Sequence, residues 1–261
     1  MKFLNIIAAS LLVLGMASCG KTASGPSPLE AQAERLDDEL GKLAEESPMY
    51  LSEIDASYEN ATLTVDIEFS DTVVNVADYS DALVQYVLAQ YLKNHTGANL
   101  DEIANTLTKE KGQLVIKLED THGNTRDYNV SAARFVKLIK LRPMELNYND
   151  VRTNVSDILA SRCASYAAAY NATSCEFDIA YSFAQYTLTF PNTRAFANLN
   201  QASLTGRYQK ILKEQYENYG ACRPMVEDLL KSLSIDGYRF IYLAPDGKSG
   251  LTAGLPWRTI N

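Results

Sequence analysis

The side chains best suited to nucleophilic chemistry are few in this 261-residue chain: four cysteines and two histidines. A Cys–His catalytic pair requires a thiol beside an imidazole. His95 is expected at a helix end and His122 at a turn, and no local signature links either to Cys163, Cys175 or Cys222. The CxxC, HExxH, GxSxG, P-loop and dinucleotide-binding glycine patterns do not occur. We therefore expect no catalytic cysteine, no cofactor and no metal centre.

Carboxylates are the other candidates for acid–base chemistry. Adjacent acids occur at Asp101-Glu102, Glu119-Asp120 and Glu227-Asp228. Neighbouring residues on a helix or strand do not share a face, so we expect these pairs to be solvated surface. Asp66 and Asp178 each lie among alternating apolar residues, which places both on the outward face of a strand. They are candidate ligand contacts, with a solubilising charge as the alternative.

The N-terminus combines a basic residue, a short apolar run and small residues before a cysteine. Lys2 is the only charge in 1–18, and the apolar run ends near Gly15. A membrane-spanning helix needs roughly 20 apolar residues, whereas a signal-peptide core has about 7 to 15. The segment Met16-Ala17-Ser18-Cys19 resembles the lipobox of bacterial lipoproteins, in which signal peptidase II cuts before the lipidated cysteine. The resemblance implies a signal peptide over 1–18 and a membrane anchor at Cys19. An ordinary secretory signal or a buried N-terminal helix is the alternative.

The same resemblance implies an address and a redox environment. Gly20 follows the cysteine where inner-membrane lipoproteins of enteric bacteria usually carry aspartate, which implies the outer membrane, on its periplasmic face or at the cell surface. An exported chain meets oxidising conditions, so a disulfide is plausible, and we favour Cys163 with Cys175. Sequence does not decide the connectivity, and three small buried thiols are the alternative. Asp71-Thr72-Val73 also resembles a periplasmic O-glycosylation signal centred on Thr72, although a turn at a strand end is the favoured interpretation.

Charge is unevenly distributed and excludes some partners. The chain has a formal net charge of −8, and removal of 1–18 takes away only Lys2, which gives 23 − 32 = −9. Seven acids and two basic residues within 29–46 account for −5 of this charge. No basic patch is present, so we expect no nucleic-acid partner. Sixteen tyrosines favour a protein or glycan partner or core packing, and Tyr181, Tyr208 and Tyr216 are expected in the core.

Hydrophobic spacing predicts the elements that position these residues. A flexible tether over 19–28 precedes an amphipathic helix over 29–47. A first α+β module over 48–142 follows, with a strand in 60–71, helices in 78–94 and 100–109, and a hairpin in 113–131. A linking helix over 143–169 leads to a second α+β module over 170–261.

The second module repeats the order of the first. Residues 65–70 align with 177–182, and 115–118 align with 240–243. We interpret this as a diverged tandem duplication of a β-α-α-β-β unit. In the second copy the alternation changes parity near Ala184-Gln185, which predicts a β-bulge within one strand. The predicted fold class is therefore α+β, with two such modules joined by a long helix.

These patterns together predict a lipid-anchored cell-envelope protein that acts as a non-catalytic binding or accessory module. A structural or assembly component of an envelope complex is the first alternative. A hydrolase whose carboxylates converge only in three dimensions is the second. A deep pocket with facing acids would favour the hydrolase, and a broad shallow patch would favour docking.

Overall fold

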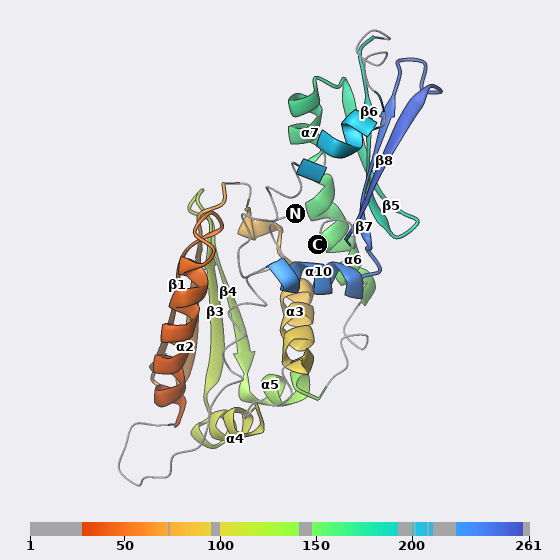
Figure 1. Cartoon of the computed structure of the whole chain (residues 1–261). Coiled ribbons are helices and arrows are strands. Elements are labelled where there is room, and N and C mark those ends of the chain that lie inside the picture. Colours follow the sequence, from red (N-terminus) through yellow and green to blue (C-terminus); the bar gives the residue numbers. More distant parts are fainter. Residues whose placement is uncertain are drawn as a thin grey trace. The chain divides into compact units, whose positions relative to one another are not determined.

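The computed structural model describes residues 28–72, 74–94, 100–140, 148–192, 200, 202–207, 209–210 and 223–257. They form two compact units (Figure 1). Unit 1 runs to Val151 and includes the start of helix α10 (Arg223–Ser232) as far as Val226, and unit 2 comprises the rest. Among the described residues, no helix has the length and apolar character to cross a membrane.

Unit 1 contains a four-stranded sheet in the order β1-β2-β3-β4. The two outer strand pairs are antiparallel and the central pair is parallel. A parallel pair requires a long crossover, which the segments between β2 and β3 provide. The elements are α2 (Pro28–Glu45), β1 (Leu51–Glu59), β2 (Thr62–Phe69), the 3-10 helix η2 (Val76–Asp78), α3 (Asp81–Asn94), α4 (Leu100–Glu110), β3 (Gln113–Glu119), β4 (Thr125–Ser131) and α5 (Ala132–Leu138).

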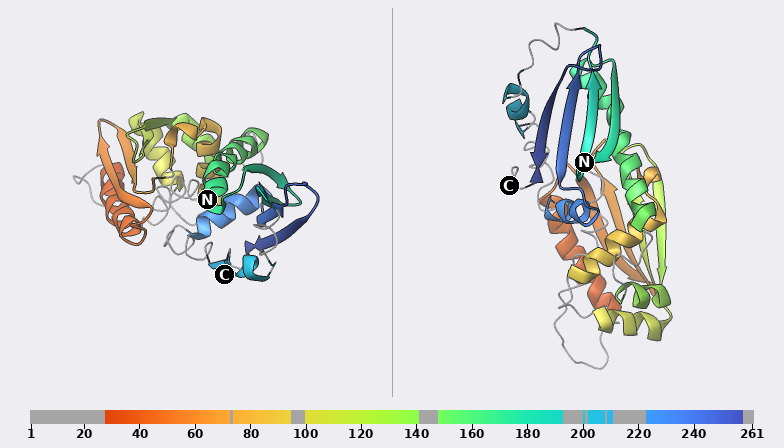
Figure 2. Two further views of the ribbon diagram at one scale, coloured as in Figure 1. Left: turned by 90° about the horizontal axis from the view of Figure 1, so that it is seen from above. Right: turned by 90° about the vertical axis from the view of Figure 1, so that its right-hand side faces the viewer.

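Unit 2 contains a second four-stranded sheet, in the order β5-β6-β7-β8, with the same pattern of parallel and antiparallel neighbours. In the right-hand view of Figure 2 its strands face the viewer, with α6 and α7 behind them. Its elements are α6 (Tyr148–Ala160) from Arg152 onward, α7 (Cys163–Tyr170), β5 (Ser174–Ala180), β6 (Phe183–Thr189), the larger part of α10, β7 (Gly237–Leu243) and β8 (Gly250–Pro256).

The first two strands of each sheet form a hairpin with a two-residue turn that the sequence patterns did not reveal. The turns are Asn60-Ala61 and Tyr181-Ser182, and all four residues have positive φ. In unit 1 the unpredicted strand is β1, which pairs with β2. In unit 2 the predicted single strand with a bulge at 184–185 is wrong, because the segment folds back as β5 and β6. Across a two-residue turn, each odd-numbered residue of one strand faces an even-numbered residue of the other. The residues of the buried face therefore change from odd to even numbers at the turn, and no bulge is needed.

The hairpins also correct the alignment of the two modules. Counted from the turns, Asp66 of β2 corresponds to Thr187 of β6, whereas Asp178 of β5 corresponds to Ser57 of β1. The alignment of 65–70 with 177–182 therefore compared different strands. The alignment of 115–118 with 240–243 is one residue out of register, since Ile116 pairs with Val65 and Phe240 pairs with Tyr186.

Helices α2, α3, α4 and α10 lie where helices were expected, whereas α5 and η2 were not predicted and the linking helix is interrupted. Helix α2 lies in the range expected for the amphipathic helix and packs along β1. The predicted linking helix over 143–169 is not continuous, because α6 ends at Ala160 and α7 begins at Cys163. Residues 141–147 lie outside the described part of the chain. Helix α7 ends at Tyr170, and the left-handed conformation of the next residue, Asn171, caps its last turn.

The two cores differ in composition. The buried face of the unit 1 sheet is mainly aliphatic, with Leu63, Val65, Ile67, Leu114, Ile116 and Leu118 nearly inaccessible. The buried face of the unit 2 sheet is mainly aromatic. Tyr166 of α7 contacts Tyr186 and Phe240, with ring centroids 4.7 and 5.4 Å apart. The Tyr186 hydroxyl donates to the Leu159 carbonyl of α6 at 2.9 Å, so the aromatic core is also tied to a helix backbone.

Candidate functional site

The open face of the unit 1 sheet, which is the face opposite its buried core, is strongly acidic. Its charged side chains belong to alternate positions on all four strands. The acids are Glu53, Asp55, Glu59, Asp66, Glu68, Glu119 and Asp127. Lys117 is the one basic residue among them, so these side chains sum to 1 − 7 = −6. A sheet surface of this kind repels anions and attracts cationic groups.

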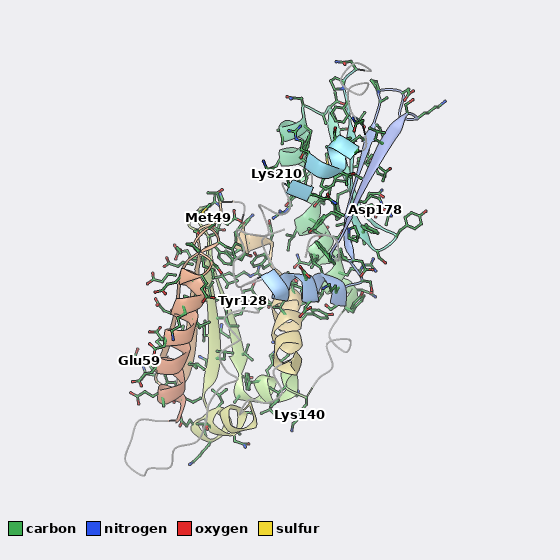
Figure 3. The ribbon with its side chains drawn as sticks, viewed as in Figure 1. Met49, Glu59, Tyr128, Lys140, Asp178 and Lys210 are labelled. Carbon is green, nitrogen blue, oxygen red and sulfur yellow. The ribbon has the colours of Figure 1, made fainter. Side chains whose placement is uncertain are left out.

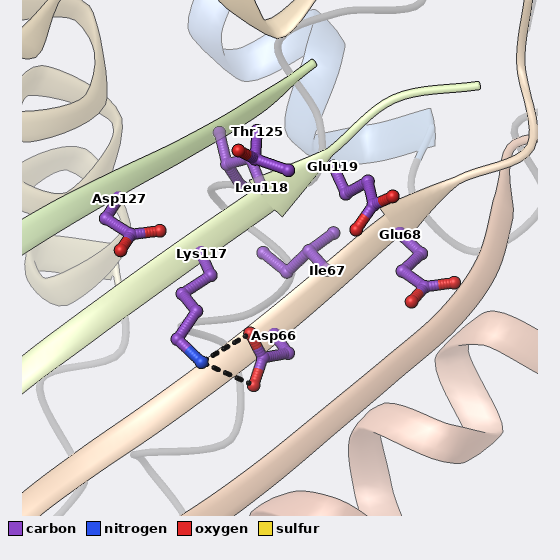
Figure 4. Close-up of a pocket in the computed structure, with 8 residues that line it drawn as sticks. All are labelled: Asp66, Ile67, Glu68, Lys117, Leu118, Glu119, Thr125 and Asp127. Atoms are coloured by element: carbon purple, nitrogen blue, oxygen red, sulfur yellow. Dashed lines mark hydrogen bonds and ion pairs between the residues drawn. The ribbon is translucent and has the colours of Figure 1, made fainter. Parts of the chain in front are cut away.

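A hollow of about 340 Å³ lies on this open face (Figure 4). Among its lining residues, Lys117 pairs with Asp66 on the neighbouring strand, with the ammonium 3.4 and 3.5 Å from the two carboxylate oxygens. Both side chains are nearly half exposed, so the pair contributes little to stability. The hollow is lined by Asp66, Ile67, Glu68, Lys117, Leu118, Glu119, Thr125 and Asp127. The candidate ligand contact Asp66 therefore lies in a concave, mixed-charge site.

Carboxylates also crowd the free edge of this sheet. The Asp37 carboxylate of α2 accepts a hydrogen bond from the Ala56 amide at 2.9 Å, which satisfies a donor on edge strand β1. Partial burial raises the pKa of Asp55, and the nearby carboxylates of Glu53, Asp37 and Asp66 raise it further. The helix thus protects the sheet edge while adding negative charge beside the open face.

The open face of the unit 2 sheet has a different character. Glu176, Asp178 and Arg239 are its charged residues within the described strands, so they sum to 1 − 2 = −1. Asp178 lies on β5, where its carboxylate accepts the adjacent Ile179 amide at 2.8 Å (Figure 3). Asp66 and Asp178 belong to different units and to non-equivalent strands, so the structure does not bring these two candidates together as copies of one site.

Tyr181, Phe183 and Arg239 form a cluster at the β5–β6 end of this open face. The Arg239 guanidinium carbon lies 4.6 Å from the ring centroid of Phe183 and 5.4 Å from that of Tyr181. Tyr181 is 85% exposed, so the prediction that it lies in the core is wrong. The error has the same origin as the predicted bulge, because Tyr-Ser is an uncommon pair for a two-residue turn. Sequence reasoning did not identify this cluster, since Arg239 is remote in the chain.

The β3–β4 loop is organised by a buried carboxylate. Asp120 accepts hydrogen bonds from the Val76, His122 and Asn124 amides at 3.0, 2.9 and 3.1 Å, and from the Asn124 side chain. Burial alone would raise its pKa, but these donors outweigh burial and lower it. The expectation that Asp120 is solvated surface is therefore wrong. Its bond to Val76 ties the loop to η2.

A second acid expected at the surface is also buried. Glu227 of α10 is 5% exposed, and its carboxylate lies 3.0 Å from the Lys231 ammonium one helical turn later. The i, i+4 spacing places the two side chains on one helix face. Its sequence neighbour Asp228 is exposed, as expected for a surface acid. Glu227 and Asp228 are therefore not an acid–base couple, because the first side chain is buried and the second is exposed.

The favoured cysteine pair is brought together in unit 2. The Sγ atoms of Cys163, at the start of α7, and Cys175, on β5, lie 2.8 Å apart, and both residues are free thiols here. Burial and the neighbouring thiol raise the pKa of Cys175. The spacing supports a bridge between these two residues, which stays a prediction.

The remaining predicted residues are scattered. Thr72 is exposed in the turn after β2, and the exposed His122 ring nitrogen lies 3.8 Å from the Asp120 carboxylate. Cys19, His95, Cys222, Tyr208 and Tyr216 lie outside the described residues. In the described ranges, no group of three or more His, Cys, Asp or Glu side chains is arranged to hold a metal ion.

Comparison with known proteins gives no relative from which a role could be carried over. The chain matches no protein-family model, no curated protein and no solved structure. The function must therefore be argued from the open faces of the two sheets.

Proposed function

We propose that the chain is a lipid-anchored protein of the cell envelope, held at the outer membrane through Cys19, and that it acts as a non-catalytic binding or accessory module. The observation that supports binding is the open face of unit 2. Where a solvated sheet face normally carries polar residues, this one presents Tyr181, Phe183, Ile241 and Leu243. Apolar groups gathered on a surface are typical of an interaction site.

The unit 1 open face supports the same class of function for a different reason. Its charges come from all four strands, and several of them line the hollow. The alternative of an assembly component uses the same faces to dock on a larger envelope complex without a small ligand. Both versions place the contacts on the open faces rather than on the helices.

Site-specific photocrosslinking tests the binding proposal. A photoreactive residue at Thr252, on the open face of unit 2, is expected to crosslink a discrete envelope species in cells. The control position is Thr153, an exposed residue of α6. Asp127 occupies the unit 1 position that matches Thr252 and reports on the acidic face. Equal crosslinking from Thr153 and Thr252 would contradict the proposal.

A hydrolase is the second candidate, because four carboxylates line the unit 1 hollow: Asp66, Glu68, Glu119 and Asp127. We favour binding because Asp66 is paired with Lys117 rather than left to act as an acid or base. Turnover of glycoside or ester reporter substrates that disappears in a Glu119→Gln variant would reverse this preference.

The anchor is tested separately from the binding function. Metabolic labelling with a palmitate analogue is expected to tag the wild-type protein and not a Cys19→Ala variant. Equal labelling of the two proteins would contradict lipidation at this residue.

We also infer that the two units arose by tandem duplication. The equal strand order, the two-residue turns with positive φ and the placement of Gly123 and Gly247 in matching loops support this origin. The common unit is then a pair of hairpins joined by a helical crossover, rather than β-α-α-β-β.

A further inference from the structure

The turn residue Tyr181 has an unfavourable backbone conformation for its type. Its φ is +53°, and Ser182 that follows has φ +61°. A two-residue turn of this geometry favours Asn, Asp and Gly, and a bulky side chain at positive φ is strained. Unit 1 has Asn60 in the matching position, with φ +51°. The same turn therefore has a low-strain residue in one unit and a strained one in the other.

Packing within unit 2 does not account for this tyrosine. The residue is 85% exposed, and its ring contact is with Arg239. An exposed cation–π contact is weak and does not exceed the cost of a left-handed backbone conformation at a bulky residue. Strain at an exposed residue is a feature of recognition sites, where the side chain is positioned for a partner.

Arg239 contacts two rings, and no carboxylate in the described parts of the chain forms an ion pair with it. Its guanidinium carbon lies over Phe183 and Tyr181. These contacts restrict the guanidinium, whose N–H edge can bind another group. That edge matches the two oxygens of a carboxylate.

The neighbouring positions on β7 favour a peptide ligand. Ile241 and Leu243 follow Arg239 on the same face and are partly exposed. The matching positions of unit 1 are the charged residues Lys117 and Glu119. Aliphatic side chains beside an aromatic pair suit the apolar side chains of a peptide better than the hydroxyl-rich surface of a glycan.

We propose that Tyr181, Phe183 and Arg239, extended by Ile241 and Leu243, bind a protein segment that presents a carboxylate next to aliphatic side chains. The proposal rests on the binding function above and names its partner class. Arg239 binds the carboxylate, the rings orient Arg239 and contact the segment, and the two aliphatic residues cover its apolar side chains.

A random dodecapeptide library displayed on phage and selected on the purified mature protein tests the ligand class. The expected peptides carry Asp, Glu or a free C-terminus beside Leu, Ile or Val, and they bind in solution by fluorescence anisotropy. Arg239→Ala should weaken binding at least tenfold, and Arg239→Lys should restore it only in part because lysine lacks the bidentate edge. Arg134→Ala, at an exposed arginine of α5 outside both open faces, is the matched control and should leave binding unchanged.

The outcomes separate this site from the general binding function. Peptides that bind equally well to Arg239→Ala would overturn the site and leave a binding function elsewhere on the protein. Selection of basic peptides, failure to enrich any peptide, or binding of acidic glycans in place of peptides would also overturn the proposal.

Stability supplies a second readout that needs no ligand. Tyr181→Asn places the residue type of unit 1 in the strained turn, so the Tm of the variant should rise while peptide binding falls. Asn60→Tyr is the reciprocal control and should lower the Tm. A lower Tm for Tyr181→Asn would show that Tyr181 is a structural residue of the hairpin and would overturn the proposal.

Discussion

Matching positions of the two sheets carry different side chains on one face and similar ones on the other. On the open faces, Lys117 and Glu119 of β3 correspond to Ile241 and Leu243 of β7. On the buried faces, Ile116 corresponds to Phe240, and both are apolar and inaccessible. The core constrains both units to bury apolar groups, whereas the open faces respond only to solvent and to partners. The divergence of the open faces is therefore where we expect separate functions.

The loops at one end of the sheets differ in the same way. Asp120 is buried and ties its loop to η2, while Asp246 accepts hydrogen bonds from the Lys248 and Ser249 amides and the Ser249 hydroxyl of its own loop. Both loops contain a glycine with positive φ, Gly123 and Gly247, so their turns are closely related. One loop is integrated into the core of its unit and the other is held at the surface.

Truncation of the aromatic core should give the largest effect. Phe240→Ala removes a ring that contacts Tyr166 and Tyr186, and we expect it to lower the free energy of unfolding by roughly 3–5 kcal/mol. Ile116→Ala at the matching position of unit 1 should cost about 2–4 kcal/mol. Urea denaturation followed by near-ultraviolet circular dichroism compares the two. A loss below about 1 kcal/mol for Phe240→Ala would contradict the assigned core.

Oxidation of the thiol pair should give the next largest effect, and only in unit 2. A Cys163–Cys175 bridge closes a short loop and should stabilise the unit by about 3 kcal/mol, as the two thiols lose two protons and two electrons to an envelope thiol oxidant. The matching position of Cys175 in β1 is Ile54, so unit 1 has no equivalent bridge. Mass mapping without reductant checks the connectivity. A bridge that contains Cys222 would disprove the pairing.

The two loop aspartates should differ in their effect on stability and in its pH dependence. Asp120→Ala leaves several donors unpaired near η2 and should cost about 2–3 kcal/mol at neutral pH. Folding lowers the pKa of Asp120, so the ionised carboxylate stabilises the folded protein. This contribution to the free energy of unfolding is full above about pH 4 and is lost as the pH falls further through the folded pKa. Asp246→Ala should have a much smaller effect, since that side chain is exposed. Thermal unfolding between pH 2 and 7 distinguishes them, and equal losses would contradict the comparison.

Charge removal on the open faces should give the smallest effect. The pKa of Asp55 is raised in the folded protein, so its ionisation at neutral pH opposes folding. Asp55→Asn is therefore expected to raise the free energy of unfolding by at most about 0.5 kcal/mol at low salt, and less at high salt. The Tm should rise slightly with it. Asp178→Asn, on the less charged face, should leave the Tm unchanged. A larger rise for Asp178→Asn would contradict the contrast between the two faces.

The local periodic patterns were reliable where a single element decides the outcome. The spacing of Leu63, Val65 and Ile67 predicted a strand with one buried face, and those residues are buried. The strand over 51–59 was missed because its pattern is mostly polar, and an edge strand is stabilised by pairing rather than by its own apolar side chains. The turn at 181–182 was missed because Tyr-Ser is not a typical turn pair, and the surrounding hairpin imposes its conformation.

The sequence by itself determined the class of the protein: an α+β chain with two sets of alternating strands and amphipathic helices, together with the spacing of Cys163 and Cys175. Only the tertiary structure decided the strand order, the depth of Asp120 and the exposure of Tyr181. Periodicity reports which side of an element is apolar, but not which element it meets. The meeting of Arg239 with Tyr181 and Phe183 depends on the pairing of β6 with β7 across about fifty intervening residues, and that pairing is a property of the folded chain.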